Sequence, residues 1–244
     1  GFLLDDNTTL VVFESAKVGE IGDGVETCTL CQKGNNYEQA EEEKKAYRKP
    51  CKISSGTSID VGTQIACGEE KFHIVSKTST TVTMFTDNVI KDDYTQKTSS
   101  EDWDNVSSLY IGNTAYWLNG SSLKTKYGTS YPAYVYDSNS ATYPLLQGYQ
   151  NYLINTLGVS NAIVKMTDIN QYLSLGCTKS SDKVSCSSAP SWVNSTGSGF
   201  LLGTMYSSNK VYVMFGKNIY SYVYSDIATG TRASVTIPIN QIKQ

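Results

Sequence analysis

The chain has 244 residues, of which 39% are hydrophobic and only 18% are charged, with a formal net charge of −3. This length allows one large or two modest domains, with a core large enough to fold unaided. The acidic balance excludes nucleic acid as the expected partner, because phosphate binding requires a basic surface. No apolar run approaches the length of a transmembrane helix, and a single histidine removes most histidine-based catalysis and metal binding.

The first 55 residues contain a strand signal and a charged segment. Residues 8–14 are rich in β-forming side chains, which predicts a strand. Residues 37–49 are mostly Glu, Lys and Arg and are followed by Pro50, which predicts a short helix. Its charges could form a docking patch, but a solvated helix face is the more common meaning of such a run.

Strands and turns dominate the chain after residue 55, with two interruptions of helical character. Strands are expected at 64–68, 71–76 and 80–86, and a closing antiparallel meander at 200–206, 210–215, 218–224 and 233–238. Helices are expected at 143–158, where Gly158 is the stop signal, and at 166–173, where Thr167 or Asp168 is the N-cap. Together these elements predict an α+β fold with mixed or antiparallel strands and two or three helices.

The six cysteines are even in number, which fits an oxidising environment in which disulfides persist. Cys177 and Cys186 close a short polar loop and are the best candidates for a disulfide. The remaining four fit two further disulfides, which we favour, a zinc site or free thiols, and their pairing stays open: Cys28, Cys31, Cys51 and Cys67.

Three segments in the order 59–75, 81–90 and 190–203, followed by a terminal strand at 230–237, resemble a bacterial family of secreted proteins with a C-type lectin-like fold. That family is related in fold to formylglycine-generating enzymes and to the variable receptor proteins of diversity-generating retroelements. The resemblance implies a C-type lectin-like domain at 56–244, preceded by an N-terminal extension at 1–55. Within the shared segments, Trp192 is expected to anchor the core under a loop, and Arg232 to be buried and to tie loops together.

Several chemistries lack the residues that they need. The acidic run at 101–105 differs in order from the calcium-binding run of true C-type lectins, and no EF-hand loop occurs. Cys177 and Cys186 lack the surroundings of a copper-binding pair. His73 is expected to be an exposed strand histidine, without the motif of a serine hydrolase. We therefore expect neither a metal nor another cofactor.

Aromatic residues between 103 and 136 lie among Ser, Gly and Asn, a composition that makes adaptable contact surfaces. The alternative is that these rings only cover a sheet. The candidate ligand-binding residues are Trp103, Tyr110, Tyr116, Trp117, Tyr127, Tyr131, Tyr134 and Tyr136.

The sequence thus predicts a non-catalytic binding module, secreted or on a bacterial cell surface and anchored by a segment outside this sequence, with a protein or glycan as ligand. The first alternative is an enzyme of unrecognised type that uses Asp102, Asp104 or Asp137 as acid or base. The second is a structural surface-layer component. A deep pocket with two carboxyl groups of raised pKa would favour the enzyme.

Overall fold

The computed structural model describes residues 2–4, 9–11, 50–53, 57–96, 109–110, 130–138, 140, 142–181, 183–194, 199–207, 210–223 and 228–243. The chain divides into two units, Gly1–Lys49 and Pro50–Gln244, whereas the sequence analysis places the division after residue 55. In the first unit, β1 (Phe2–Leu4) pairs antiparallel with β2 (Thr9–Val11). The helix predicted at 37–49 lies outside the described residues.

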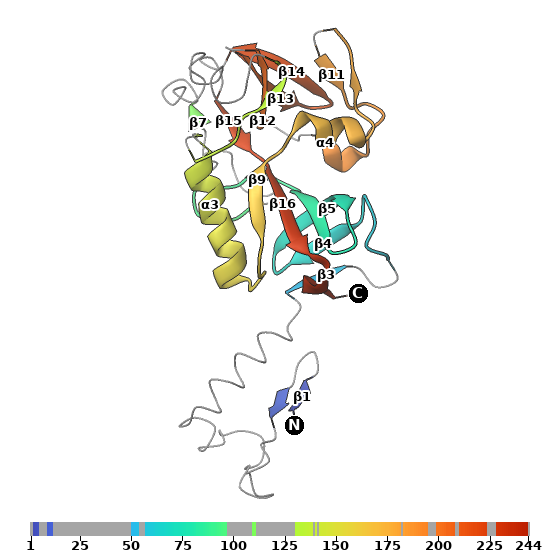
Figure 1. Ribbon diagram of the computed structural model, residues 1–244, viewed down its shortest axis with the longest axis vertical. Helices are drawn as coiled ribbons and strands as arrows, with labels where there is room; N and C mark the ends of the chain where they lie inside the picture. The colour runs from blue at the N-terminus through green and yellow to red at the C-terminus, as the bar shows by residue number, and fades with distance from the viewer. Residues whose placement is uncertain are drawn as a thin grey trace, which may run out of the picture. The chain divides into compact units, whose positions relative to one another are not determined.

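In the described part of the second unit, the strands form two sheets, one of seven strands and one of eight (Figure 1). The seven-stranded sheet has the order β17 (Ile242–Lys243), β3 (Cys51–Ile53), β4 (Gln64–Cys67), β5 (Glu70–Lys77), β6 (Thr81–Thr86), β16 (Ala233–Pro238) and β9 (Ile163–Met166). Its strands are antiparallel except for the pair β17 and β3. Phe72 and Ile74 of β5 are buried while Lys71 is exposed, which is the alternation that a half-buried strand requires.

The eight-stranded sheet contains the meander predicted near the end of the chain. Its order is β10 (Thr178–Lys179), β11 (Lys183–Ser185), β14 (Asn218–Val223), β13 (Lys210–Phe215), β12 (Phe200–Ser207), β15 (Ala228–Thr231) and β7 (Leu109–Tyr110), with β8 (Ala133–Tyr134) also paired to β12. The antiparallel hairpins β12–β13 and β13–β14 confirm the first three strands of the meander. The fourth predicted strand is instead β16 of the other sheet, because the chain crosses between the sheets at Arg232.

Two helical segments occur where periodicity predicts them. Helix α3 (Tyr143–Asn151) continues as a π-helical segment, η4 (Tyr152–Thr156), and packs beside β9 (Figure 1). Gly158 follows with φ of +74°, as its predicted role of stop signal requires. Helix α4 (Ile169–Ser174) begins at Asp168, whose side chain accepts a hydrogen bond from the backbone N–H of Asn170 and forms a capping box with Gln171.

The predicted α+β class is wrong, because the described part of the chain is mainly β. Its one long helix, α3 with η4, has 14 residues, and α4 has only 6. The strands between residues 200 and 231 belong to one sheet, whereas β16 joins the strands between residues 64 and 86 in the other. Strand pairing, rather than helix packing, therefore builds most of the domain.

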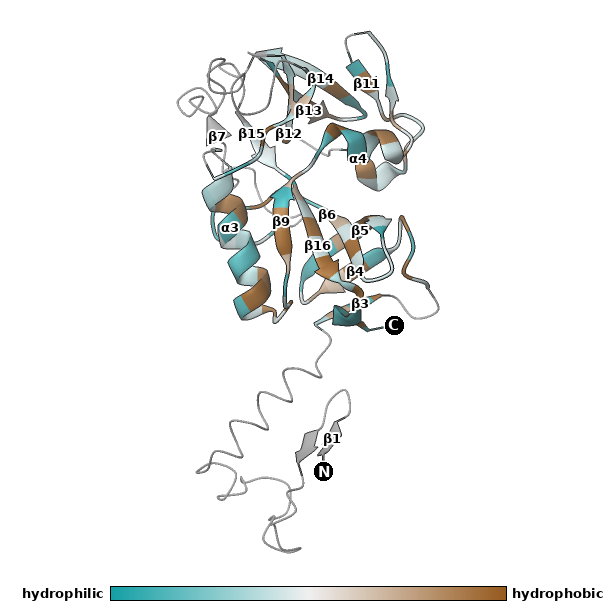
Figure 2. Ribbon diagram, in the orientation of Figure 1, coloured by the Kyte–Doolittle hydropathy of each residue, from teal (hydrophilic) through white to brown (hydrophobic). Residues whose placement is uncertain are grey.

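Two hydrophobic clusters fill the second unit. The larger one joins the seven-stranded sheet and α3 to one face of β12 and β13, and Figure 2 shows hydrophobic residues along β9 and β16. The smaller one lies under α4 and the 3₁₀ segment η5 (Ser191–Val193), against the opposite face of β12 to β14. No helix in the described part of the chain has the length and apolar content needed to cross a membrane.

Among the described residues, two disulfides join neighbouring parts of the chain, one near each sheet. Cys177–Cys186 connects the ends of the β10–β11 hairpin, which confirms this predicted pair. Cys51–Cys67 joins directly opposed residues of β3 and β4, a pairing that the sequence analysis left open. Because Cys51 and Cys67 bond to each other, they do not form a zinc site with Cys28 and Cys31, which lie outside the described residues. The disulfides indicate an extracellular environment.

Candidate functional site

Half of the predicted ligand-binding set lies outside the described residues. Trp103, Tyr116, Trp117 and Tyr127 are in this group, and so are Asp102 and Asp104 of the alternative enzyme. Tyr110 is described only as part of β7, which pairs with β15.

The other three described members of that set lie against the interior. Tyr131 and Tyr136 are half-buried and pack on the larger hydrophobic cluster, and burial raises the pKa of Tyr136 to about 12. The hydroxyl of Tyr134 donates to the backbone oxygen of Met166 at 2.9 Å. In the described region, these rings therefore support the core where β8 joins β12.

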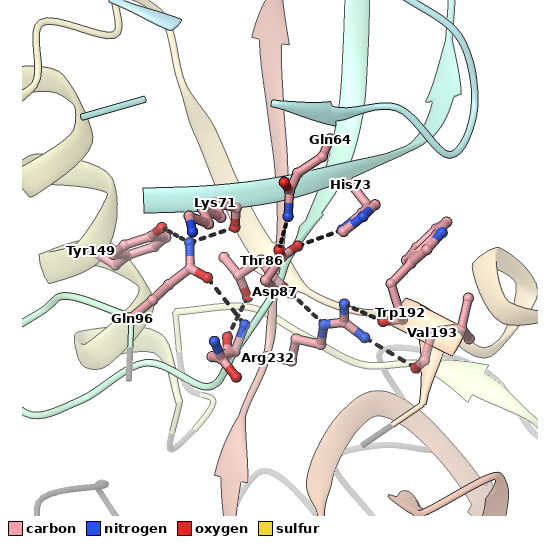
Figure 3. Close-up of polar contacts among 11 residues, drawn as sticks. Gln64, Lys71, His73, Thr86, Asp87, Gln96, Tyr149, Trp192, Val193 and Arg232 are labelled. Atoms are coloured by element: carbon pink, nitrogen blue, oxygen red, sulfur yellow. Dashed lines mark hydrogen bonds and ion pairs between the residues drawn. The ribbon is translucent and has the colours of Figure 1, made fainter. Parts of the chain in front are cut away.

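Arg232 is the most deeply placed cation of the described chain, with 1% of its surface exposed. Its guanidinium donates to the backbone oxygens of Thr86, of Val193 at 3.1 Å and of Trp192 at 2.9 Å (Figure 3). The carbon of the guanidinium group lies 5.2 Å from the ring centre of Phe85. Burial lowers the pKa of Arg232, and nearby Tyr172 and Asp87 oppose this shift. Arg232 thus connects the end of β6, η5 and the crossing between the two sheets.

Next to Arg232, four side chains form a polar group centred on Asp87 (Figure 3). Nδ1 of His73 lies 2.6 Å from Oδ1 of Asp87, and Nε2 of Gln64 donates to Oδ2 of Asp87 at 2.6 Å. The His73 ring stacks on the Trp192 ring, with centroids 4.7 Å apart and planes within 5°. The side chains of His73 and Asp87 are 15% and 17% exposed. The expectation of an exposed histidine is wrong, because Trp192 of η5 covers the ring.

The geometry around Asp87 indicates a structural role for this group rather than a catalytic one. Both carboxylate oxygens of Asp87 already accept hydrogen bonds, and one face of His73 is covered. Gln64 and His73 are directly opposed in the β4–β5 register, and Asp87 follows β6, so adjacent strands bring the three together. A general base must have a free position facing its substrate, and the contacts of this pair instead fix η5 against the sheet.

A second polar group is buried between β5 and α3. Glu70 is 3% exposed and accepts a hydrogen bond from the hydroxyl of Tyr149 at 2.7 Å. The backbone N–H of Gln96 donates to both oxygens of Glu70, at 3.1 and 3.2 Å, and Nε2 of Gln96 donates to the hydroxyl of Tyr149. Burial raises the pKa of Glu70, although these donors oppose the shift. Burial also raises the pKa of Tyr149 well above its ordinary value.

A partly exposed group of aromatic rings lies on the eight-stranded sheet. We call Phe215, Tyr220 and Tyr222 the aromatic face. The Tyr222 ring lies 5.5 Å from that of Phe215 and 6.2 Å from that of Tyr220, in edge-to-face geometry. Tyr222 is 38% exposed, whereas the alternating residue Ile219 is buried in the smaller cluster. The alternation of Ile219 with Tyr220 and Tyr222 along β14 is the signal in the sequence that indicates this pair of rings on one face.

Comparison with models of protein families, with curated proteins and with solved structures gives no match to the chain. The comparisons therefore neither support nor oppose the resemblance to secreted bacterial C-type lectin-like proteins. Within the described residues, no group of three or more His, Cys, Asp or Glu side chains is placed to hold a metal ion.

Proposed function

We propose that this protein is a non-catalytic binding module that acts outside the cell or at a cell surface and recognises a protein or glycan ligand. The observation that carries the proposal is the aromatic face, in which Tyr222 is 38% exposed while its ring contacts Phe215 and Tyr220. Tyrosine presents a large, rigid and amphipathic surface at low entropic cost, which suits recognition.

The scaffold behind the aromatic face supports the same proposal. Tyr220 and Tyr222 belong to β14, which is hydrogen-bonded to β11 on one side and to β13 on the other. The residues Ile219 and Met214 behind the face are fully buried. Rings held on a paired strand over a packed core are already ordered before binding, which reduces the entropic cost of association.

The alternative of a carboxylate-based enzyme has weaker support in the described residues. Its geometric requirement is a pair of carboxyl groups with separated pKa values next to a substrate. The carboxyl group of Glu70 has a raised pKa, but its 3% exposure leaves it facing Tyr149 and Gln96 rather than solvent.

A glycan array, combined with a pull-down of purified cell-surface proteins, tests the proposal. We expect the wild-type protein to bind a ligand that the double variant Tyr220→Ser/Tyr222→Ser binds at least tenfold more weakly. Tyr94→Asn is the matched control, because Tyr94 is exposed elsewhere in the chain and asparagine tolerates its φ of +64°. Equal binding by the double variant would show that the aromatic face is not the site.

A further inference from the structure

Two lysines, Lys183 and Lys217, lie near the aromatic face. Lys183 of β11 is directly opposite Tyr220 of β14, so that both side chains project from the same side of the sheet. Lys217 lies in the turn that joins β13 to β14, two residues after Phe215. Both lysines are exposed.

Lys183 and Lys217 have no carboxylate partner among the described residues, where the ion pairs join Lys77 to Asp60, Lys91 to Asp93 and His73 to Asp87. Asp182, the acidic residue next to Lys183 in the sequence, lies outside the described residues. A chain with a net charge of −3 thus presents locally unpaired positive charge around its exposed rings.

We propose that the ligand of the aromatic face is an anionic polysaccharide, with carboxylate or sulfate groups along its chain. This inference rests on the proposed function of a binding module. Tyr220 and Tyr222 offer ring surfaces for the apolar faces of sugar rings, and the lysine ammonium groups attract the anions. Lysine acts as a mobile point charge rather than a bidentate fork, which suits anions that are spaced along a flexible polymer.

The topology favours a polysaccharide over an acidic polypeptide. An extended peptide gains affinity mainly by adding main-chain hydrogen bonds at a free sheet edge. Lys183–Ser185 of β11 pairs with Asn218–Tyr220 of β14, and β13 pairs with the other side of β14. The edge of β14 at Tyr220 is therefore covered, and a ligand binds there through ring stacking and charge.

Titration calorimetry of the full chain with four polymers tests the inference: polygalacturonate, heparin, neutral dextran and polyglutamate. We expect binding of polygalacturonate or heparin that weakens as salt is added, and no measurable binding of dextran or polyglutamate. Tyr222→Thr should weaken binding about three- to tenfold, and Lys183→Gln about two- to fivefold. The matched controls Tyr94→Asn and Lys165→Gln, at exposed positions elsewhere, should bind as the wild type does.

Each other outcome has a defined meaning. Equal affinity for dextran, or a neutral ligand from the array that requires Tyr222, would overturn the anionic class and leave the binding module in place. Polyglutamate bound as tightly through Lys183 and Tyr222 would replace the polysaccharide with an acidic polypeptide. If neither acidic polysaccharide binds, the inference fails, and if the array and the pull-down also give no ligand, the proposed function fails with it.

Discussion

The two sheets of the second unit use tyrosine in opposite ways. Behind the seven-stranded sheet, Tyr149 is fully buried and its hydroxyl donates to the carboxyl group of Glu70. On the eight-stranded sheet, Tyr220 and Tyr222 face outward beside Lys183. Tyrosine therefore has two roles in this protein: it forms a hydrogen bond with a buried carboxyl group, and it forms part of the surface.

This difference shows that the effect of substituting a tyrosine depends on its surroundings. A buried hydroxyl needs a partner, so that changing Tyr149 or Glu70 affects folding. An exposed ring has little to lose in stability, so that changing Tyr222 affects recognition. Arg232 lies where the chain passes from one sheet to the other. We therefore expect its substitution to affect both sheets and to have the largest effect on folding.

The largest effect is expected from Arg232→Met. The substitution removes a buried cation and leaves the backbone oxygens of Thr86, Trp192 and Val193 without their donor. We expect the free energy of unfolding to fall by about 3–5 kcal/mol, measured by urea denaturation with circular dichroism. Lys165→Met at an exposed position of β9 is the control. A fall below about 1 kcal/mol would mean that Arg232 does not hold the sheets together.

Removal of a disulfide should have the second-largest effect on stability. The loss should differ between the two disulfides. Cys51–Cys67 spans a sequence separation of 16 residues and Cys177–Cys186 one of 9. Loop-closure entropy predicts losses of about 3 kcal/mol for Cys51→Ala/Cys67→Ala and about 2.5 kcal/mol for Cys177→Ala/Cys186→Ala. Urea denaturation of both double variants without reductant measures the order. A clearly larger loss near the eight-stranded sheet would contradict the entropic explanation.

The buried carboxyl group of Glu70, behind the seven-stranded sheet, should make the free energy of unfolding depend on pH. Burial raises the pKa of Glu70 above its ordinary value of 4.5, so the folded state holds this proton more tightly than the unfolded state. The stability that Glu70 contributes is therefore complete below pH 4.5 and is lost as the pH rises through the folded-state pKa. Compared with Glu70→Gln, the wild type should lose stability from acid toward neutral pH.

Urea denaturation of the wild type and of Glu70→Gln across that range measures the difference. The neighbouring substitution Glu69→Gln is the control, because Glu69 is exposed. If the wild type and Glu70→Gln keep a constant difference at every pH, then Glu70 has no raised pKa in the folded protein.

The smallest effects on stability are expected on the eight-stranded sheet. Lys183→Gln should change the free energy of unfolding by less than about 0.5 kcal/mol, because Lys183 is exposed. Tyr222→Thr should cost about 1 kcal/mol or less, since Tyr222 is exposed and its substitution removes ring contacts with Phe215 and Tyr220. Thermal unfolding of both variants provides the measurement. A large loss from either substitution would assign the aromatic face to folding.

Local patterns were enough to predict many elements but not their class. The signals for β5, β12, β13 and β14 and for the two helices agree with the structure, as do Gly158 and Asp168 at the helix boundaries. The predicted α+β class failed because short helical signals do not reveal how little of the packing the helices provide. The candidate site was harder to predict, because Trp192 reaches His73 across 119 residues of chain.

The sequence by itself determined those features that depend on near neighbours: strand alternation, helix stop and cap, and the short loop closed by Cys177 and Cys186. The tertiary structure alone decided that β16 joins β6 and β9 instead of the meander, and that Trp192 covers His73. It also decided which carbonyl oxygens receive the guanidinium of Arg232. The physical reason is that propensity acts over a few residues, whereas strand pairing and burial are set by contacts between segments far apart in the chain.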